Sequence, residues 1–297
     1  MKIPGLIILF CTILHAWLIA QDFSSDFQLT ISSDKTSYIE GESVWIKVEV
    51  TNQSASDRFI YDLTNDRILS GNFLDFTIKN SLDELIPYGR NRANDWPKIT
   101  LKPNETVYNY FDLPNYYGNS ITDPYIGRRL MPADIYQCTA TLLFDTRVPG
   151  VVSDTISFTV RPAVGAEQAV FQNFIRGYEA WLIDFEDSRA VSIYEELIRQ
   201  SPQSVFALLS AYYVNKITLM SDELARDGIE ESLDFVTRYP DSPFAYKAVK
   251  QAVISAYQYH RLKDLTARIN PALSKMEPYF PGLTRLINDM IQQYQSE

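Results

Sequence analysis

The spacing of the apolar residues changes once along the chain, at residues 161–166 (RPAVGA). Upstream, apolar residues alternate with polar ones, as in residues 44–50, which is the period of a strand with one buried face. Downstream they recur every three or four residues, which is the period of a helix. One such stripe is predicted to consist of Val170, Phe174, Tyr178 and Trp181, and another lies within residues 245–256. This change predicts an all-β sandwich of short antiparallel strands over residues 21–163, followed by an all-α domain of helical hairpins over residues 164–297.

The first twenty residues have the layout of a secretory signal peptide. An almost unbroken apolar run follows Lys2, and polar Gln21 comes directly after Ala20. Cleavage after Ala20 would place the mature protein in the periplasm, at the cell surface or outside the cell. The alternative is a retained anchor, since a run of this length is near the lower limit for spanning a bilayer. We expect cleavage, and hence no stable membrane insertion, because a polar segment follows without a cationic stop-transfer cluster.

The composition excludes several classes of function. The formal net charge is −10 and both predicted domains are acidic, so we expect no nucleic-acid partner. After signal cleavage one cysteine, Cys138, and one histidine, His260, remain in different domains. They cannot supply the three or four ligands of a usual zinc site, and we expect no metal and no other cofactor. Catalysis by a Ser or Cys nucleophile would need His260 as its base, but its place at the end of a helical run favours a cation that complements the helix dipole.

The N-terminal half carries a family resemblance in three segments. Residues 33–52 (SDKTSYIEGESVWIKVEVTN) resemble the first two strands of macroglobulin-type and related bacterial immunoglobulin-like domains. Residues 99–107 (ITLKPNETV) and 129–142 (RLMPADIYQCTATL) resemble the bacterial intracellular proteinase inhibitor family and its relatives. The resemblance implies an immunoglobulin-like sandwich, in which Asn104 and Asp134 replace glycines because both residue types tolerate left-handed backbone. It specifies a fold better than a function.

The stretch ADIYQC, residues 133–138, has the Asp-Tyr-Cys spacing of strand F in antibody domains. An antibody-type disulfide needs a second Cys on a facing strand, but the inward positions of residues 44–50 are all Val or Ile. We therefore predict no disulfide, with Tyr136 as a tyrosine corner whose hydroxyl bonds nearby backbone. Cys138 is predicted to fill the core; the alternative is a reactive thiol, although no flanking Lys, Arg or His would lower its pKa.

Residues 86–129 are rich in Tyr, Trp and Arg, with Asn and Gly between them. Such side chains on loops supply a large contact area at a small entropic cost, as in protein-binding sites. We therefore predict that this segment binds another protein. The candidate residues are Trp96, Tyr108, Tyr110, Tyr116, Tyr117, Tyr125, Arg128 and Arg129. The alternative is that many of these rings pack against the helical domain or cap the sandwich core.

The helical half repeats itself. SPQSVFA at residues 201–207 matches YPDSPFA at residues 239–245. Pro202, Pro240 and Pro278 follow one another at intervals of 38 residues. Paired helices with a period of this size indicate a short solenoid.

The first unit of this repeat resembles a tetratricopeptide repeat. Ala190, Tyr194, Leu197 and Pro202 stand at the steps shown by that motif's second helix. Later units depart from it, because Gly228 replaces the motif's Ala and the period exceeds the usual value of about 34 residues. The phrase P-x-S-x-F-A also resembles tetratricopeptide-like domains of bacterial envelope assembly proteins. That resemblance implies protein binding without catalysis.

These patterns favour a non-enzymatic interaction or scaffolding protein of the bacterial envelope or exterior. The family resemblance alone suggests an alternative, a protease inhibitor acting through a sandwich loop. A second alternative is a carboxylate-based hydrolase, since the chain has many Asp and Glu residues, but no recognisable spaced pair. The sequence also lacks a phosphate-binding loop, a GxSxG elbow and an HExxH string.

Overall fold

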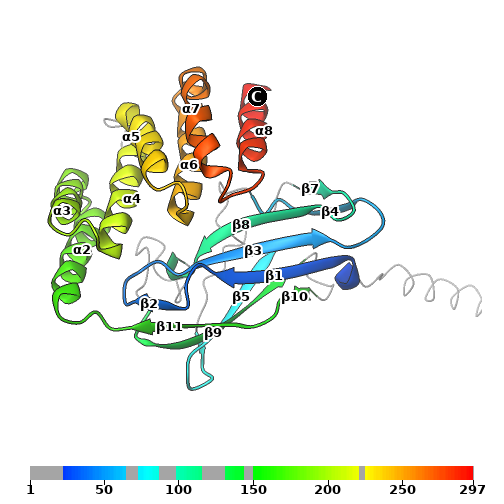
Figure 1. Ribbon diagram of the computed structural model, residues 1–297, viewed down its shortest axis with the longest axis horizontal. Coiled ribbons are helices and arrows are strands. Elements are labelled where there is room, and N and C mark those ends of the chain that lie inside the picture. The colour runs from blue at the N-terminus through cyan, green and yellow to red at the C-terminus, as the bar shows by residue number, and fades with distance from the viewer. Residues whose placement is uncertain are drawn as a thin grey trace, which may run out of the picture. The chain divides into compact units, whose positions relative to one another are not determined.

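Strands occupy the N-terminal half of the protein and helices the C-terminal half (Figure 1). The computed structural model describes residues 23–64, 73–86, 98–115, 131–143, 150–220 and 225–296. The predicted signal peptide lies outside these ranges. Within them, no helix is both long enough and apolar enough to cross a membrane.

The strands form three sheets. The first has the order β1-β3-β8, the second the order β2-β11-β9-β5-β6 with β10 on β9, and the third pairs β4 with β7. The β2–β11 pair is parallel, whereas β1–β3, β5–β9, β5–β6, β4–β7 and β9–β10 are antiparallel. The bounds are β1 Phe27–Ser33, β2 Ser37–Ile39, β3 Trp45–Asn52, β4 Arg58–Tyr61, β5 Leu74–Lys79, β6 Leu85–Ile86, β7 Lys98–Leu101, β8 Thr106–Asp112, β9 Asp134–Leu142, β10 Val151–Val152 and β11 Ile156–Arg161.

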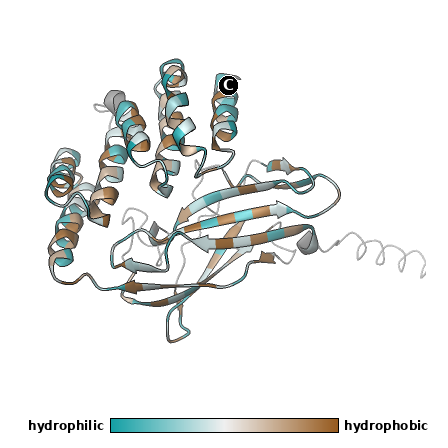
Figure 2. Ribbon diagram, in the orientation of Figure 1, coloured by the Kyte–Doolittle hydropathy of each residue, from teal (hydrophilic) through white to brown (hydrophobic). Residues whose placement is uncertain are grey.

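The alternation predicted for β3 is confirmed, because Ile46, Val48 and Val50 are fully buried while the residues between them are partly exposed. Figure 2 shows the hydropathy of the residues along the strands. In β9 the same alternation holds, with Tyr136, Cys138, Ala140 and Leu142 buried on one face. Ile135 is 54% exposed, and the buried face starts at Tyr136. The buried ring of Tyr136 stacks on Phe158 with centroids 5.6 Å apart, while the hydroxyl bond that defines a tyrosine corner stays a prediction.

The two residues predicted to replace glycine, Asn104 and Asp134, differ in their backbone conformation. Asn104 has a φ of 63° in the turn between β7 and β8, so the prediction of left-handed backbone is confirmed there. Asp134 is the first residue of β9 and does not have a positive φ, so the prediction is wrong for that residue. A strand start needs extended backbone, which any residue adopts.

Cys138 is a buried free thiol in β9. Its side chain is fully shielded from solvent, and burial raises the pKa of the thiol to about 12. The thiolate is the reactive form, so we expect the native protein to resist alkylation at pH 8. A maleimide reagent should label Cys138 only after denaturation, as measured by intact mass. Rapid labelling of the folded protein, or a disulfide-linked dimer, would contradict this burial.

The helices pack as consecutive pairs. Each helix contacts the next along the chain, and α2, α4, α6 and α8 also contact one another in that order, as do α5 and α7. This pattern places α2, α4, α6 and α8 in one layer and α5 and α7 in another. The bounds are α2 Ala166–Leu182, α3 Asp187–Gln200, α4 Val205–Met220, α5 Ala225–Arg238, α6 Pro243–Gln258, α7 Leu262–Met276 and α8 Leu283–Ser296.

The 38-residue interval of the sequence recurs in backbone hydrogen bonds. The amides of Ser201, Tyr239 and Glu277 each donate to a carbonyl four residues earlier, and every one of these bonds is 2.9 Å long. Six residues further on, Ala207, Ala245 and Leu283 each donate to a carbonyl three residues earlier, over 2.9, 2.9 and 3.0 Å. The turns that contain Pro202, Pro240 and Pro278 therefore share two closing bonds.

The predicted apolar stripe of α6 is confirmed, since residues from Ala245 to Ala256 on that stripe are fully buried. The stripe predicted for α2 is wrong. Of Val170, Phe174, Tyr178 and Trp181, Phe174 alone is buried, and the buried face of α2 consists of Phe171, Phe174, Gly177 and Ala180. Gly177 belongs to this face because the ring of Tyr194 in α3 leaves no room for a β-carbon. A β-carbon at residue 177 would lie only 2.5 Å from the Cε1 of that ring.

Gly228 allows α5 to approach the backbone of α4. A β-carbon on Gly228 would lie 2.9 Å from the amide nitrogen of Leu219. Beside this contact the amide of Asn215 donates to the hydroxyl of Ser232 over 2.6 Å, and that hydroxyl donates to the carbonyl of Gly228 over 2.7 Å. Gly228 therefore stands in place of the motif's Ala because a β-carbon would clash with the backbone of α4.

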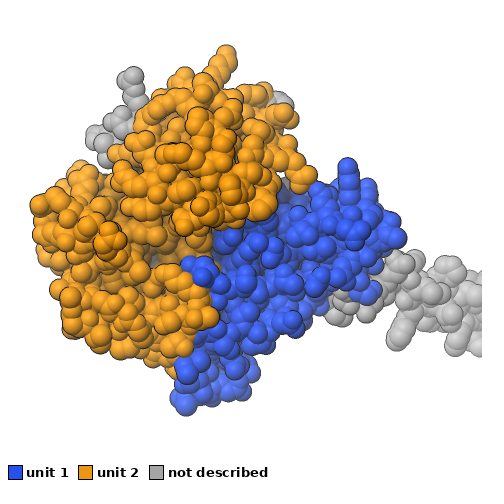
Figure 3. Space-filling view, viewed as in Figure 1, with its two compact units in different colours: residues 1–34, 46–111, 135–158 blue, residues 35–45, 112–134, 159–297 orange. Residues whose placement is uncertain are grey.

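The chain divides into two compact units (Figure 3). One consists of residues 1–34, 46–111 and 135–158, and the other of residues 35–45, 112–134 and 159–297. The helices thus share their unit with residues 35–45, a segment of the N-terminal half. The predicted boundary between residues 163 and 164 stays a prediction.

Residues 35–45 comprise β2 and the turn that leads into β3, and they belong to the segment 33–52 that resembles immunoglobulin-like domains. Lys35 forms a salt bridge with Glu42 through its Nζ, and its amide donates to the Tyr38 hydroxyl over 3.1 Å. The other Glu42 carboxylate oxygen accepts the amide of Ile39 at 3.0 Å. Gly41 has a φ of 84°, a conformation that L side chains rarely adopt. These bonds therefore all lie within residues 35–45.

Two helices contact this turn through aromatic rings. Phe171 of α2 lies against Gly41, with its Cε2 2.4 Å from the position that a β-carbon would take. Phe244 of α6 meets Trp45 edge to face, with ring centroids 5.0 Å apart, and also contacts Tyr212 of α4. The core of the helical unit therefore extends into residues 35–45.

Candidate functional site: the tyrosine face of the β1-β3-β8 sheet

Two of the eight predicted site residues lie in the described structure, and the sheet brings them together. Tyr108 and Tyr110 are both in β8, two residues apart, so they project from the same face of the strand. Their ring centroids are 6.1 Å apart at an interplanar angle of 87°. The alternating residues Asn109 and Phe111 are buried, while both tyrosines are partly exposed. The remaining six candidates, Trp96, Tyr116, Tyr117, Tyr125, Arg128 and Arg129, lie outside the described residues.

Strand β3 supplies the polar neighbours of these rings. The Nζ of Lys47 lies 4.8 Å from the centroid of Tyr108 and 2.8 Å from the Oε1 of Glu49. Further along, the hydroxyls of Thr51 and Thr106 are 2.8 Å apart. We call these residues the tyrosine face: Lys47, Glu49 and Thr51 of β3 with Thr106, Tyr108 and Tyr110 of β8. On its other side, Thr30 and Ser32 of β1 stand opposite Glu49 and Lys47.

Burial and nearby carboxylates keep the phenol of Tyr110 neutral. Burial raises the pKa of Tyr110 to about 12, and the carboxylates of Glu49 and Asp34 contribute in the same direction. A phenol with this pKa donates and accepts hydrogen bonds at neutral pH and does not serve as a base. Lys47, held between Glu49 and the Tyr108 ring, adds a cation–π contact. The face can therefore present aromatic area and hydrogen-bonding groups to a partner.

The contribution of β3 to the tyrosine face could not be predicted from the sequence. Lys47, Glu49 and Thr51 were expected to oppose the buried residues of their strand, which is confirmed, but nothing in the pattern paired them with Tyr108. That pairing depends on β8 lying beside β3, and two strands so far apart in the sequence give no local signal of it.

Other potential catalytic groups are placed as follows. Among the described residues, no group of three or more His, Cys, Asp or Glu side chains could hold a metal ion. His260 follows the C-cap residue of α6 with a φ of 56°, so it lies at the helix end where the sequence placed it.

No protein-family model matches this chain, and no curated protein matches it significantly. Among solved structures it shows a weak likeness to a β-glucosidase from Listeria innocua, with 14% identity over 46% of this chain and a TM-score of 0.26. The chain spans 16% of that enzyme's length. A second weak likeness is to the sporulation control protein Spo0M from Bacillus subtilis, with 14% identity, 52% of this chain, 56% of that chain and a TM-score of 0.26. Likenesses of this size carry no argument about fold or function.

Proposed function

We propose that this chain is an exported, non-enzymatic protein that binds another protein and acts as an interaction or scaffolding component of the bacterial envelope or exterior. In this proposal the strands form an immunoglobulin-like sandwich and the helices a tetratricopeptide-like repeat. The antiparallel pairs of both larger sheets support the first assignment. The layered helix pairs support the second.

The observation that carries the proposal is the recurrence of the same backbone bonds every 38 residues in the helical unit. An array in which each hairpin packs mainly on its neighbours is extended, so it offers much surface for its length. Repeat arrays of this kind use that surface to bind other proteins. The tyrosine face supplies the chemistry of a contact in the other unit, because Tyr rings beside a cation are typical of protein interfaces.

The test is site-specific cross-linking of the full chain expressed in its source organism. A photoreactive phenylalanine analogue at position 108 should yield one discrete cross-linked protein. The matched control position is Tyr61 in β4, a partly exposed tyrosine whose ring also lies near a lysine, with the Nζ of Lys98 at 5.2 Å from its centroid. Cross-linking from position 108 and not from position 61 is the expected result.

The same sample tests export. The intact mass of the cross-linking-competent protein should correspond to a chain that begins at Gln21. A full-length N-terminus would contradict cleavage, and equal cross-linking from both positions would contradict a specific protein contact at the tyrosine face. Turnover of a glycoside or peptide substrate that is lost on substituting a single carboxylate would contradict the non-enzymatic assignment.

A further inference from the structure

The turn between α2 and α3 exposes two large apolar side chains. We call residues 183–186 the Phe185 turn: Phe185 is 74% exposed and Ile183 is 58% exposed. Single exposed apolar residues are common on protein surfaces and need no explanation. Here, however, an aromatic and an aliphatic residue stand two positions apart at the tip of a helical hairpin.

Phe185 occupies its position at an energetic cost. Its φ is 56°, in the left-handed region that favours Gly or Asn and in which a bulky residue is an outlier. Three backbone bonds hold the turn: the amides of Ile183 and Asp184 donate to the carbonyl of Glu179, and the amide of Glu186 donates to the carbonyl of Ala180 over 2.8 Å. Left-handed backbone is less stable than right-handed backbone for an L residue, because the β-carbon crowds the following carbonyl oxygen. Strain of this kind, kept by the surrounding structure, occurs preferentially at functional sites.

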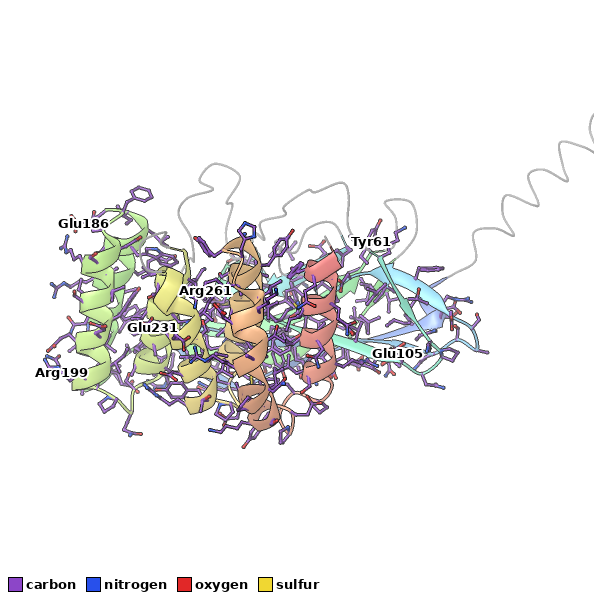
Figure 4. All side chains as sticks on the ribbon, turned by 90° about the horizontal axis from the view of Figure 1, so that it is seen from above. Tyr61, Glu105, Glu186, Arg199, Glu231 and Arg261 are labelled. Atoms are coloured by element: carbon purple, nitrogen blue, oxygen red, sulfur yellow. The ribbon has the colours of Figure 1, made fainter. Side chains whose placement is uncertain are left out.

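An acidic rim surrounds the turn. Asp184, Glu186 and Asp187 lie within or next to it, and all three are at least partly exposed. Arg189 is the neighbouring base, and its Nη1 lies 2.8 Å from the Oε2 of Glu186 and 3.5 Å from the Oδ2 of Asp184. Figure 4 shows Glu186 at one end of α3, with Arg199 towards the other. Three carboxylates and one guanidinium leave the rim negatively charged.

We propose that the Phe185 turn is a docking site for a partner protein that offers an apolar pocket rimmed by Lys or Arg. Phe185 enters the pocket as an aromatic anchor, and the carboxylates of Asp184, Glu186 and Asp187 face the basic rim. A partner with a basic rim is favoured because its positive charge complements the three carboxylates of the turn. Bacterial membrane surfaces rich in anionic lipid repel an acidic rim, and so does a second copy of a chain with a net charge of −10. The site is separate from the tyrosine face and lies in the helical unit.

The test uses the full mature protein and a displayed library of random 16-residue peptides as the probe. Selected peptides should combine an apolar segment with Lys or Arg, and their binding should weaken as salt rises. Phe185→Asn should weaken the best peptide by about 30-fold, as expected for a central aromatic anchor. The same variant should melt at an equal or higher temperature, because Asn tolerates the left-handed backbone that strains Phe.

Two controls separate docking from general stickiness. Tyr279 in the α7–α8 turn is 55% exposed, so Tyr279→Asn removes a comparable aromatic surface and should leave peptide binding unchanged. Glu186→Lys should weaken binding while keeping Phe185. A lower melting temperature for Phe185→Asn would mean that the ring supports the fold and would overturn the proposal. So would selected peptides that lack basic residues, peptides that bind Phe185→Asn as well as wild type, or Phe185-dependent binding to phosphatidylglycerol vesicles.

Discussion

Gly41→Ala is expected to destabilise the protein by about 3 kcal/mol or more, as measured by the free energy of unfolding in urea. Two costs combine at this position. The φ of 84° is strained for any L residue, and the new β-carbon would approach the Cε2 of Phe171 to 2.4 Å. Because Phe171 is buried and contacts Phe206, the ring has little room to retreat.

Substituting Gly165 would measure a backbone cost without a steric clash. Gly165 also has a positive φ, 59°, but no atom lies within 4 Å of the position of its β-carbon. Gly165→Ala should therefore show the backbone cost alone, about 1–3 kcal/mol for a residue with a φ of 59° and a ψ of −127°. Adding Phe171→Leu to Gly41→Ala should recover part of the lost stability. If Phe171→Leu recovers none of the stability lost in Gly41→Ala, the turn is not packed rigidly against Phe171 of α2.

Gly228→Ala is the second substitution with a large expected effect, again about 3 kcal/mol. Its β-carbon would meet backbone atoms of α4, namely the nitrogen and Cα of Leu219 at 2.9 and 3.0 Å. To relieve this clash the two helices must separate, which would strain the hydrogen bond between Asn215 and Ser232. Without a clash, alanine in place of glycine would stabilise the helix by about 1 kcal/mol. A loss of stability in Gly228→Ala would therefore indicate the clash, and a gain would indicate its absence.

Gly177→Ala is the matched control for this prediction. The β-carbon at residue 177 would meet the side chain of Tyr194 at 2.5 Å, and a side chain can be shortened. Tyr194→Leu should therefore rescue Gly177→Ala in part, whereas no single side-chain truncation should rescue Gly228→Ala. Thermal unfolding of the variants provides the comparison. A Gly228→Ala protein that is as stable as wild type, or more stable, would contradict the close approach of α5 to α4.

The sequence predicted the buried faces of single elements in which apolar residues recur with the period of a strand or helix. The alternation of β3 and the stripe of α6 follow from side-chain period alone, and the 38-residue interval of the prolines reappears in backbone bonds. The α2 stripe was misjudged because its buried face includes Gly177, which a hydrophobic pattern does not count. A glycine is buried there to admit the Tyr194 ring, and that ring belongs to another helix.

Contacts between segments that are far apart in the chain could not be predicted from the sequence pattern. Residues 33–52 were matched to a family motif, but the contact of Gly41 with Phe171 joins segments that no local spacing relates. The same holds for the tyrosine face, where Tyr108 was predicted and its partner Lys47 was not. Phe185 carried no sequence signal, since one aromatic residue in a polar turn looks like any other until its φ and exposure are known.

We propose that this protein functions by binding another protein, and binding at the tyrosine face can be measured as an affinity. The measurement is the affinity of the cross-linked partner for Tyr108→Ser and Tyr61→Ser variants, with the melting temperature of each. We expect Tyr108→Ser to lose about 2 kcal/mol of binding free energy at an unchanged melting temperature, because its ring is partly exposed beside Lys47. Tyr61→Ser should leave the affinity unchanged. Unchanged affinity for Tyr108→Ser, or a loss of affinity that merely follows a large fall in melting temperature, would contradict a protein-binding role for the tyrosine face.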